Sequence, residues 1–235
     1  MRTHEEKLYA DIEGEDGYSQ GERKDPWRYR YYGPHALMAG LMCQFLKDGG
    51  NSVLEMGVAE AFLAVRMVRT SMNLFVPGTA QLKHVEEYHG IELSHSAVEN
   101  GRIRTQMSGL DDLIKIWQGD VTDEDSWTDQ QYDIVAVNNV LPYFPEEVRK
   151  GFLDKVFKRL VKKGGHLVLF TWVSSESGDS FHGSWPRWMV RADGRLRIDQ
   201  PDYDGKNPMP YVYKYDVIRK PMDGETYTDS WAVLW

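Results

Sequence analysis

The sequence has little cysteine, no long hydrophobic run and fewer basic than acidic residues. Its 235 residues include one cysteine, Cys43, so an intramolecular disulfide is excluded and a reducing compartment is favoured. No segment is apolar over the roughly 18 residues that a membrane-spanning helix needs. Residues 1–17 also lack the apolar core of a secretion signal. We therefore expect a cytoplasmic protein that does not insert into a membrane.

Basic residues and metal-binding patterns are scarce. There are 28 basic against 36 acidic side chains, a formal net charge of −8, and such a protein repels a phosphate backbone. The basic stretches at 66–69, 158–163 and 187–197 are short, so we expect no nucleic-acid partner. No Cys/His cluster has metal-ligand spacing, and no Gly-x-Ser-x-Gly or phosphate loop is present. We therefore expect no bound metal.

Short apolar runs alternate with segments of helical periodicity, which predicts an α/β fold. The strand candidates are residues 52–55, 89–93, 114–117, 132–137 and 167–173, followed by 212–218 and 230–234. Helical spacing of apolar residues separates most of the first five. This order predicts a doubly wound, mostly parallel sheet with helices on both faces. The two late runs lack a helix between them, which brings the sheet to seven strands with an antiparallel edge strand.

Polar side chains follow the first four strand candidates. Carboxylates stand at Glu55, Glu92 and Asp120, and two amides stand at Asn138 and Asn139. Ligands of an open parallel sheet bind at the carboxyl ends of its strands. Carboxylates accept hydrogen bonds from hydroxyl and amino groups and suit phosphates badly. The pattern therefore favours a nucleoside-like ligand without phosphates over a dinucleotide.

Five segments, in chain order, resemble the motifs of class I S-adenosylmethionine-dependent methyltransferases of the small-molecule type. They are VLEMGVAEA at 53–61, GIELS at 90–94, QGDV at 118–121, YDIV with NVLPYF at 132–144, and LVKKGGHLVL at 160–169. The resemblance implies a Rossmann-like fold and S-adenosyl-L-methionine as cofactor. It also implies transfer of a methyl group to the oxygen or nitrogen of a small-molecule acceptor, and it allows a homodimer.

The resemblance also implies which residues bind the cofactor. They follow the strand ends in order: Glu55, Gly57, Ala59, Glu92, Leu93, Asp120, Val121, Asn138 and Asn139. Gly57 would pass close to the amino-acid portion of the cofactor, and Glu92 would accept from the ribose hydroxyls. Asp120 would accept from the adenine amino group and the backbone of Val121 would donate to the ring, while the two asparagines would line the methionine side.

Simpler roles stay open for these residues, and the sequence departs from the family pattern in two places. Glu92 could instead cap the following helix, Asp120 could be a turn residue, and Asn139 could be structural. Ala59 and Ala61 stand where the family usually has glycines. The 37 positions from Glu55 to Glu92 also exceed the usual spacing.

The catalytic candidates are His182 and Tyr143. We expect one domain over 1–235: an N-terminal lid or substrate segment at 1–48, a cofactor-binding core at 49–173, a substrate-side insertion at 174–210 and closing strands at 211–235. His182 lies in that insertion, whose tryptophans and tyrosines favour a cleft for an aromatic acceptor. Two rival functions stay open, a methyltransferase-like cyclase or isomerase that transfers no methyl group, and a non-catalytic binding subunit.

Overall fold

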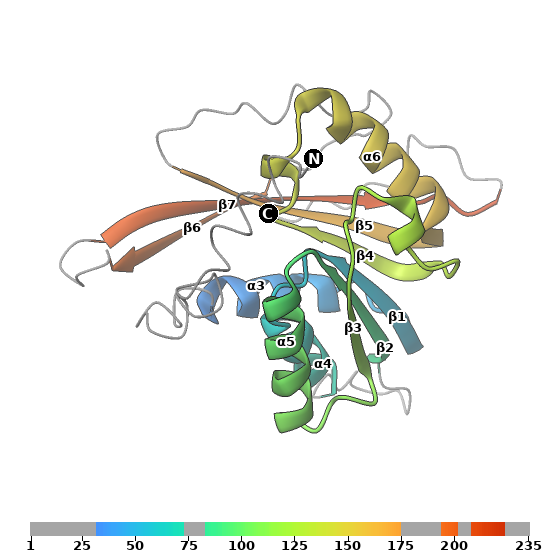
Figure 1. The fold of residues 1–235 in the computed structure, drawn as a ribbon, viewed down its shortest axis with the longest axis horizontal. Coiled ribbons are helices and arrows are strands. Elements are labelled where there is room, and N and C mark those ends of the chain that lie inside the picture. The colour runs from blue at the N-terminus through green and yellow to red at the C-terminus, as the bar shows by residue number, and fades with distance from the viewer. Residues whose placement is uncertain (1–31, 73–82, 175–193, 202–207, 224–235) are drawn as a thin grey trace.

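The computed structural model describes residues 32–72, 83–174, 194–201 and 208–223. They form a seven-stranded sheet with the order β3-β2-β1-β4-β5-β7-β6 (Figure 1). Its strands are β1 (Gly49–Met56), β2 (Lys83–Glu92), β3 (Ile114–Gln118), β4 (Tyr132–Asn138), β5 (Val161–Ser174), β6 (Gly194–Pro201) and β7 (Pro208–Arg219). The helices are α3 (Tyr32–Cys43), α4 (Phe62–Met72), α5 (His95–Met107) and α6 (Glu146–Arg159), with short 3₁₀ turns at Glu124–Ser126 and Leu141–Tyr143.

The strands confirm the expected α/β class and mostly parallel sheet. Strands β3, β2, β1, β4 and β5 pair in parallel. Strand β7 runs antiparallel to both β5 and β6. The reversed strand is therefore second from the edge, and β6 is outermost. Antiparallel pairing at this end of the sheet agrees with the sequence-based prediction, although the candidate strand at 230–234 lies outside the described residues.

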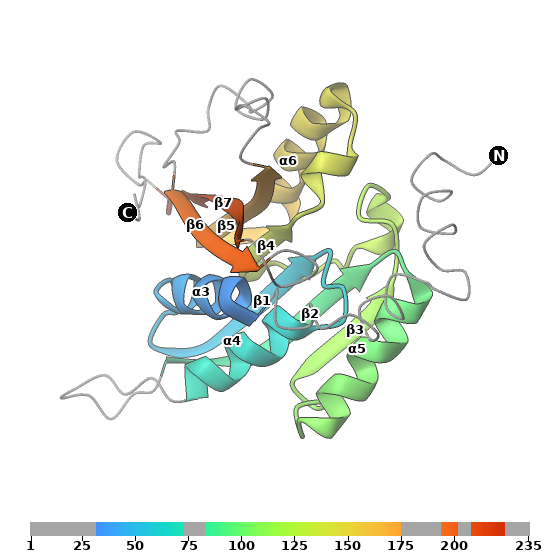
Figure 2. The ribbon, with the colours of Figure 1, turned by 90° about the vertical axis from the view of Figure 1, so that its left-hand side faces the viewer.

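Helices cover both faces of the sheet, as Figure 2 shows: α3, α4 and α5 lie on one face and α6 on the other. Alternate side chains of a strand point to opposite faces, so β1 sends Val53 into the core beneath α3 and α4. Its neighbours Leu54 and Met56 enter the core beneath α6. The central strands β1 and β4 are buried on both faces over most of their length, which is why their cores are apolar runs without polar alternation.

Strands β2 and β5 each begin about six residues earlier than their apolar runs predict. Strand β2 starts at Lys83, which pairs with Gly49, and β5 starts at Val161, which pairs with Tyr132. These first residues form backbone ladders although many of their side chains are polar, so hydropathy does not reveal them. The start of α5 is as expected, because Ser94 is its N-cap and the side chain accepts from the Ala97 N–H at 3.2 Å.

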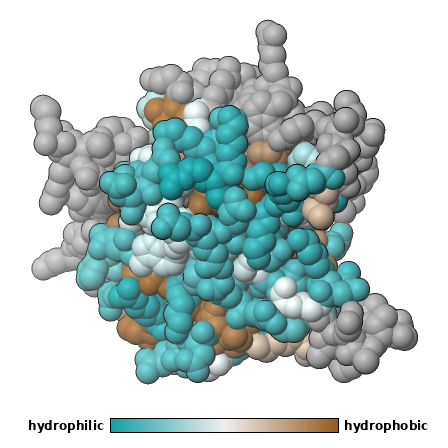
Figure 3. All heavy atoms as spheres, turned by 90° about the vertical axis from the view of Figure 1, so that its right-hand side faces the viewer, coloured by the Kyte–Doolittle hydropathy of each residue, from teal (hydrophilic) through white to brown (hydrophobic). Residues whose placement is uncertain are grey.

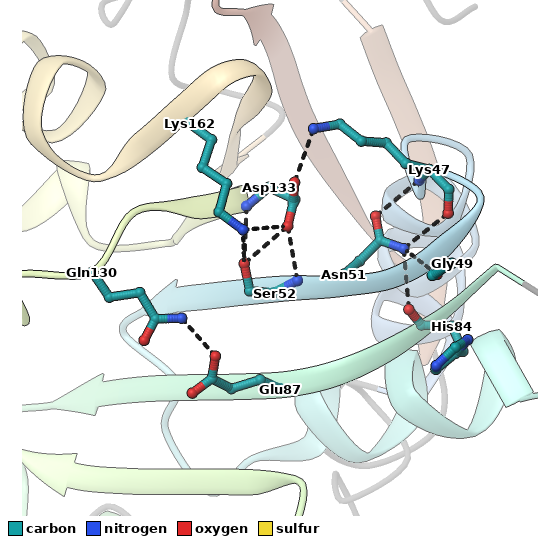
Figure 4. Close-up of polar contacts among 9 residues, drawn as sticks. All are labelled: Lys47, Gly49, Asn51, Ser52, His84, Glu87, Gln130, Asp133 and Lys162. Atoms are coloured by element: carbon teal, nitrogen blue, oxygen red, sulfur yellow. Dashed lines mark hydrogen bonds and ion pairs between the residues drawn. The ribbon is translucent and has the colours of Figure 1, made fainter.

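The amino ends of the parallel strands are closed by polar contacts. Asp133, at the start of β4, accepts hydrogen bonds from Lys47 (2.9 Å), Lys162 (2.8 Å) and the Ser52 hydroxyl (2.9 Å) (Figure 4). The Asn51 side chain closes the turn that leads into β1: its Oδ1 accepts from the Lys47 N–H, and its amide donates to the Gly49 carbonyl oxygen. Figure 3 looks at this side of the molecule, where hydrophilic side chains predominate among the described residues. Because polar side chains contact one another at the amino ends of the strands, we expect a ligand site at the carboxyl ends, where ligands of an open parallel sheet bind.

Two of the expected segments contain regular structure, while their assigned roles stay predictions. Helix α3 lies within residues 1–48, yet Met38 and Met42 are buried in the core, so this part of the segment belongs to the scaffold. Residues 194–201 and 208–210 lie within the expected insertion, yet they are strand. Among the helices of the described residues, none is both long and apolar enough to cross a membrane.

Candidate functional site

A cavity of about 250 Å³ opens at the carboxyl ends of the parallel strands. The described residues that line it are Gly57, Glu92, Leu93, Asp120, Val121, Thr122, Val140, Tyr143, Phe144, Pro145 and Val148. Five of the nine expected cofactor residues and one of the two catalytic candidates are therefore brought together here. Residues after β1, β2, β3 and β4 all contribute, as ligand binding at this edge of a parallel sheet requires.

Gly57 forms the floor of the cavity with its backbone. Its φ angle is +81°, and a Cβ atom there would lie 2.4 Å from Val140 Cγ2 and 2.8 Å from the Asn138 carbonyl oxygen. The first contact is with a side chain that lines the cavity, and the second is with backbone that cannot easily yield. Only glycine fits this turn, so the loop after β1 presents bare backbone to whatever occupies the cavity.

Glu92 lines the cavity and also fixes the loops around it. Its side chain is buried, Oε1 accepts from the Ser94 N–H at 3.1 Å, and Oε2 accepts from the Ala59 N–H at 2.9 Å. Ser94, not Glu92, is the N-cap of α5; Glu92 holds the backbone of that N-cap residue in place. Ala59 does not line the cavity among the described residues, and its N–H is instead used to hold the loop.

Asp120 combines the turn role and the site role that the sequence left open. Its Oδ1 accepts from the Thr122 N–H at 2.8 Å and from the Thr122 hydroxyl at 2.7 Å. The residue nevertheless lines the cavity beside Val121. Because both of these bonds use the same oxygen, Oδ2 can accept from a ligand. Asp120 and Glu92 therefore supply two carboxylates to one cavity.

Glu55, Asn138 and Asn139 lie beneath the cavity and are not among its described lining residues. Glu55 is fully buried, accepts from the Tyr88 hydroxyl at 2.6 Å and accepts from the Asn138 side-chain amide at 2.7 Å. The Asn139 amide in turn donates to Asn138 Oδ1 at 2.9 Å. Burial raises the pKa of Glu55 to about 8 despite the bonds from Tyr88 and Asn138, so this carboxyl group is mainly neutral at pH 7.

Sequence reasoning missed Tyr88 and most of the apolar wall of the cavity. Tyr88 lies in the middle of β2, fully buried, where nothing distinguishes it from a packed aromatic. Val140, Phe144, Pro145 and Val148 line the cavity from the 3₁₀ turn and the start of α6. The motif at 139–144 held a signal for this wall, because it directly follows the fourth strand and is rich in apolar residues.

Tyr143 is the catalytic candidate that the structure describes. It lines the cavity, and the residue is 40% exposed. Burial of the hydroxyl and the nearby charge of Glu92 both raise its pKa, so the phenol keeps its proton at neutral pH and can donate a hydrogen bond. His182 lies outside the described residues. Within those residues, no group of three or more His, Cys, Asp or Glu side chains is placed to hold a metal ion.

Three non-glycine residues near the site have left-handed backbone conformations. They are Ala59 (φ 46°), Ala61 (φ 61°) and Asn139 (φ 55°). Asparagine tolerates this region, whereas alanine carries a steric cost of about 1–2 kcal/mol. The two alanines thus adopt the backbone that glycines would favour at the positions where the sequence departs from the family pattern.

Comparison with known proteins agrees with this geometry. A family model described as a methyltransferase domain matches residues 47–187. The nonribosomal peptide synthetase dtxS1 of Metarhizium robertsii is 35% identical over 102 residues, which is 43% of this chain and 1% of that much longer protein.

Solved structures share the fold. The N-methyltransferase NodS of Bradyrhizobium japonicum, in complex with S-adenosylhomocysteine, is 16% identical with a TM-score of 0.58, over 92% of this chain and 97% of NodS. The [4+2]-cyclase SpnF is 15% identical with a TM-score of 0.51, over 80% of this chain and 82% of its own. The family match covers more than half of the sequence, and the chain therefore belongs to the methyltransferase domain family.

Proposed function

We propose that this chain is a class I S-adenosylmethionine-dependent enzyme that methylates an oxygen or nitrogen atom of a small-molecule acceptor. The observation that carries the proposal is the pairing of Glu92 and Asp120 in one cavity whose described lining includes no lysine, arginine or histidine. Such a lining suits ribose hydroxyls, an adenine amino group and a positively charged sulfur, and it disfavours a phosphate.

The residues present fit the two parts of a nucleoside. Glu92, at the end of β2, would accept from the ribose hydroxyls. Asp120 Oδ2 and the backbone N–H of Val121 would bind the adenine edge. The turn at Gly57 would let the rest of the cofactor lie against backbone. A cavity of about 250 Å³ is slightly below the usual range of about 300–1,000 Å³ for small-molecule sites, which suits the nucleoside half.

The chemistry of transfer leaves the protein with positioning and proton removal. When bound, the cofactor supplies a methyl group on positive sulfur. Transfer would join the acceptor lone pair to that methyl carbon, leave the electron pair of the carbon–sulfur bond on sulfur, and release the acceptor proton to solvent. Tyr143 would orient the acceptor, with Phe144 and Val148 forming an apolar wall. An acceptor with an aromatic body suits that wall.

The partners and location belong to the same proposal. The net charge of −8 supports a small acceptor over a nucleic acid, because a phosphate backbone would be repelled. A single cysteine supports action in the reducing cytoplasm. A homodimer is compatible with the proposal, and nothing in the site requires one.

Calorimetry and a transfer assay test the proposal in sequence. We expect S-adenosylhomocysteine to bind with micromolar affinity, about −7 to −8 kcal/mol. Methyl-labelled S-adenosylmethionine should then label one member of a panel of small phenols, amines and amino-acid derivatives. Absence of binding at millimolar ligand would overturn the cofactor assignment. Cofactor binding together with labelling of RNA or protein alone would overturn the small-molecule acceptor.

A cyclase or isomerase that keeps the cofactor is the second candidate. It is favoured by the absence of histidine and lysine from the described cavity lining and by the strained alanines in the cofactor loop. In that case the acceptor would be converted while all of the methyl label stays on the cofactor. Mass spectrometry of the product separates the two reactions, because methylation adds one CH₂ and isomerisation adds nothing.

A further inference from the structure

A second cavity, of about 140 Å³, is lined by residues of α3, α4 and α5 and by Ser108, which follows α5. Its described lining residues are His35, Phe62, Val65, Arg66, Arg69, Arg104 and Ser108. None of them also lines the cavity at the strand ends. The methyltransferase reaction proposed above gives this second cavity no role.

Three guanidinium groups make the second cavity strongly basic. Arg66 and Arg69 are three residues apart on α4, so they share one side of that helix, and Arg104 faces them from α5. No described lining residue is acidic. His35 adds no charge, because burial and then the charge of Arg104 lower its pKa to about 4. Each guanidinium offers five N–H donors, so the cavity can serve an oxyanion from several directions.

Arg104 is held in place before any ligand arrives. Its Nη2 lies 3.0 Å from Glu60 Oε2, and its Nε donates to the Glu60 carbonyl oxygen at 2.8 Å. The guanidinium also stacks on the Phe62 ring, with its carbon 3.5 Å from the ring centroid. A planar guanidinium fixed in this way loses little conformational entropy when it binds a carboxylate.

Apart from the arginines, His35 and Ser108, the described lining is apolar. Phe62 and Val65 form one wall, and the His35 ring lies nearly parallel to Phe62, at 14° and 6.0 Å between centroids. The cavity volume of about 140 Å³ is close to the roughly 150 Å³ of a cavity that binds one benzene molecule. The cavity therefore has room for a single ring or a short branched chain beside the guanidinium groups.

We propose that this second cavity binds a small aromatic or branched aliphatic carboxylate. The carboxylate would lie between Arg66, Arg69 and Arg104, and its apolar body would pack on Phe62 and Val65. Inorganic phosphate offers the same charge without the apolar body. It should therefore bind more weakly.

Calorimetry at constant ionic strength tests this site with benzoate as the probe. We expect saturable binding of benzoate, binding at least tenfold weaker for inorganic phosphate and for the neutral isostere benzamide, and the same benzoate affinity with saturating S-adenosylhomocysteine. Arg66→Gln with Arg69→Gln should weaken benzoate by about tenfold or more. Both arginines are exposed on α4, so the fold should survive, which circular dichroism checks.

The matched control is Arg102→Gln on α5. Arg102 is exposed, pairs with Glu99 and donates to the Ile116 carbonyl oxygen, all outside the second cavity, so benzoate affinity should stay at the wild-type value. The control removes one positive charge where the test variant removes two, so a loss half as large on the logarithmic scale would reduce the effect to net charge and overturn the site. The proposal is also overturned if benzoate gives no saturable heat, if phosphate binds as tightly, or if S-adenosylhomocysteine displaces benzoate. These outcomes leave the methyltransferase assignment untouched, because that assignment rests on the other cavity.

Discussion

Glu92 Oε2 lies 2.9 Å from the backbone nitrogen of Ala59, so the end of β2 holds the loop that follows β1. The same carboxylate accepts from the Ser94 N–H at the start of α5. Glu92 thus joins three elements around the cavity that it lines. A carboxylate with two fixed backbone donors cannot rotate freely, so the orientation of Glu92 at the cavity is defined before a ligand binds.

Glu92→Ala should weaken binding of S-adenosylhomocysteine by about 1–3 kcal/mol, because a charged acceptor for buried hydroxyls is lost. It should also lower the free energy of unfolding, since the Ala59 and Ser94 N–H groups lose their partner. Calorimetry and chemical denaturation measure the two effects. The control is Glu99→Ala, whose side chain is 47% exposed and pairs with Arg102 on the helix surface. Equal effects on ligand affinity would contradict the assigned role of Glu92.

Ala59→Gly should raise the free energy of unfolding by about 0.5–1 kcal/mol. The φ angle of Ala59 is 46°, and glycine removes the left-handed strain at a smaller cost in chain entropy. The control is Ala64→Gly, in the first turn of α4 and fully buried, where glycine has the lower helix propensity and should destabilise by about 1 kcal/mol. Denaturant titration of both variants checks the sign. A destabilised Ala59→Gly would mean that the methyl group contributes more packing than strain.

The strand ends were predictable because the central strands of the sheet are buried on both faces. Apolar runs located the cores of β1 to β5, and the polar residue after each run then marked the ligand edge. Gly57, Glu92 and Asp120 followed from this logic and do line the cavity. The same logic could not separate residues that point into the cavity from those that point into the core. Glu55 and Asn138 stand at strand ends, yet their side chains bond to each other beneath the site.

Contacts made across the fold were not predictable. The bonds from Tyr88 to Glu55 and from Arg104 to Glu60 join residues 33 and 44 positions apart. Neither pair has a spacing that a motif records, because each depends on how two elements pack. The partner of the edge strand β6 (Gly194–Pro201) was also not predictable, because no sequence pattern records which strands pair. Its pairing with β7 comes from the backbone and not from hydropathy.

Glu55→Gln should make the protein relatively more stable as pH rises. Burial raises the pKa of Glu55 to about 8 in the folded state, against about 4.3 for an unperturbed glutamate. Between these values the folded protein keeps a proton that the unfolded chain has lost, so wild-type stability falls with pH by at most about 1.4 kcal/mol per unit.

Glutamine resembles the neutral carboxyl group and can still bond to Tyr88 and Asn138, so the variant should lack this slope. Denaturant unfolding from pH 5 to 8.5 measures the slope, as the pH dependence of the difference in unfolding free energy between the variant and the wild type. A difference that is constant with pH would show that Glu55 ionises normally in the folded protein. Glu86→Gln, on an exposed glutamate of β2, serves as the control and should follow the wild type.

Asp133→Asn should destabilise the protein by about 1–3 kcal/mol at pH 7 without changing cofactor affinity. Burial alone would raise the pKa of Asp133, but hydrogen bonds from Lys162, Lys47 and Ser52 outweigh it and hold the pKa well below its usual range. Both lysines are more than 40% exposed, so the ion pairs are screened and the lower part of this range applies. The residue lies at the amino ends of the strands, away from the cavity at their carboxyl ends.

The pH dependence separates this role from simple packing. A carboxylate whose pKa is lowered on folding stabilises above its unfolded value of about 3.9, and that contribution is lost as pH falls below it. The gap in unfolding free energy between wild type and Asp133→Asn should therefore be constant from pH 5 to 7 and shrink below pH 4. Asp154→Asn, which breaks only an exposed pair with Lys158, should cost less than about 0.5 kcal/mol. A gap that persists unchanged at pH 3 would assign the loss to shape and not to charge.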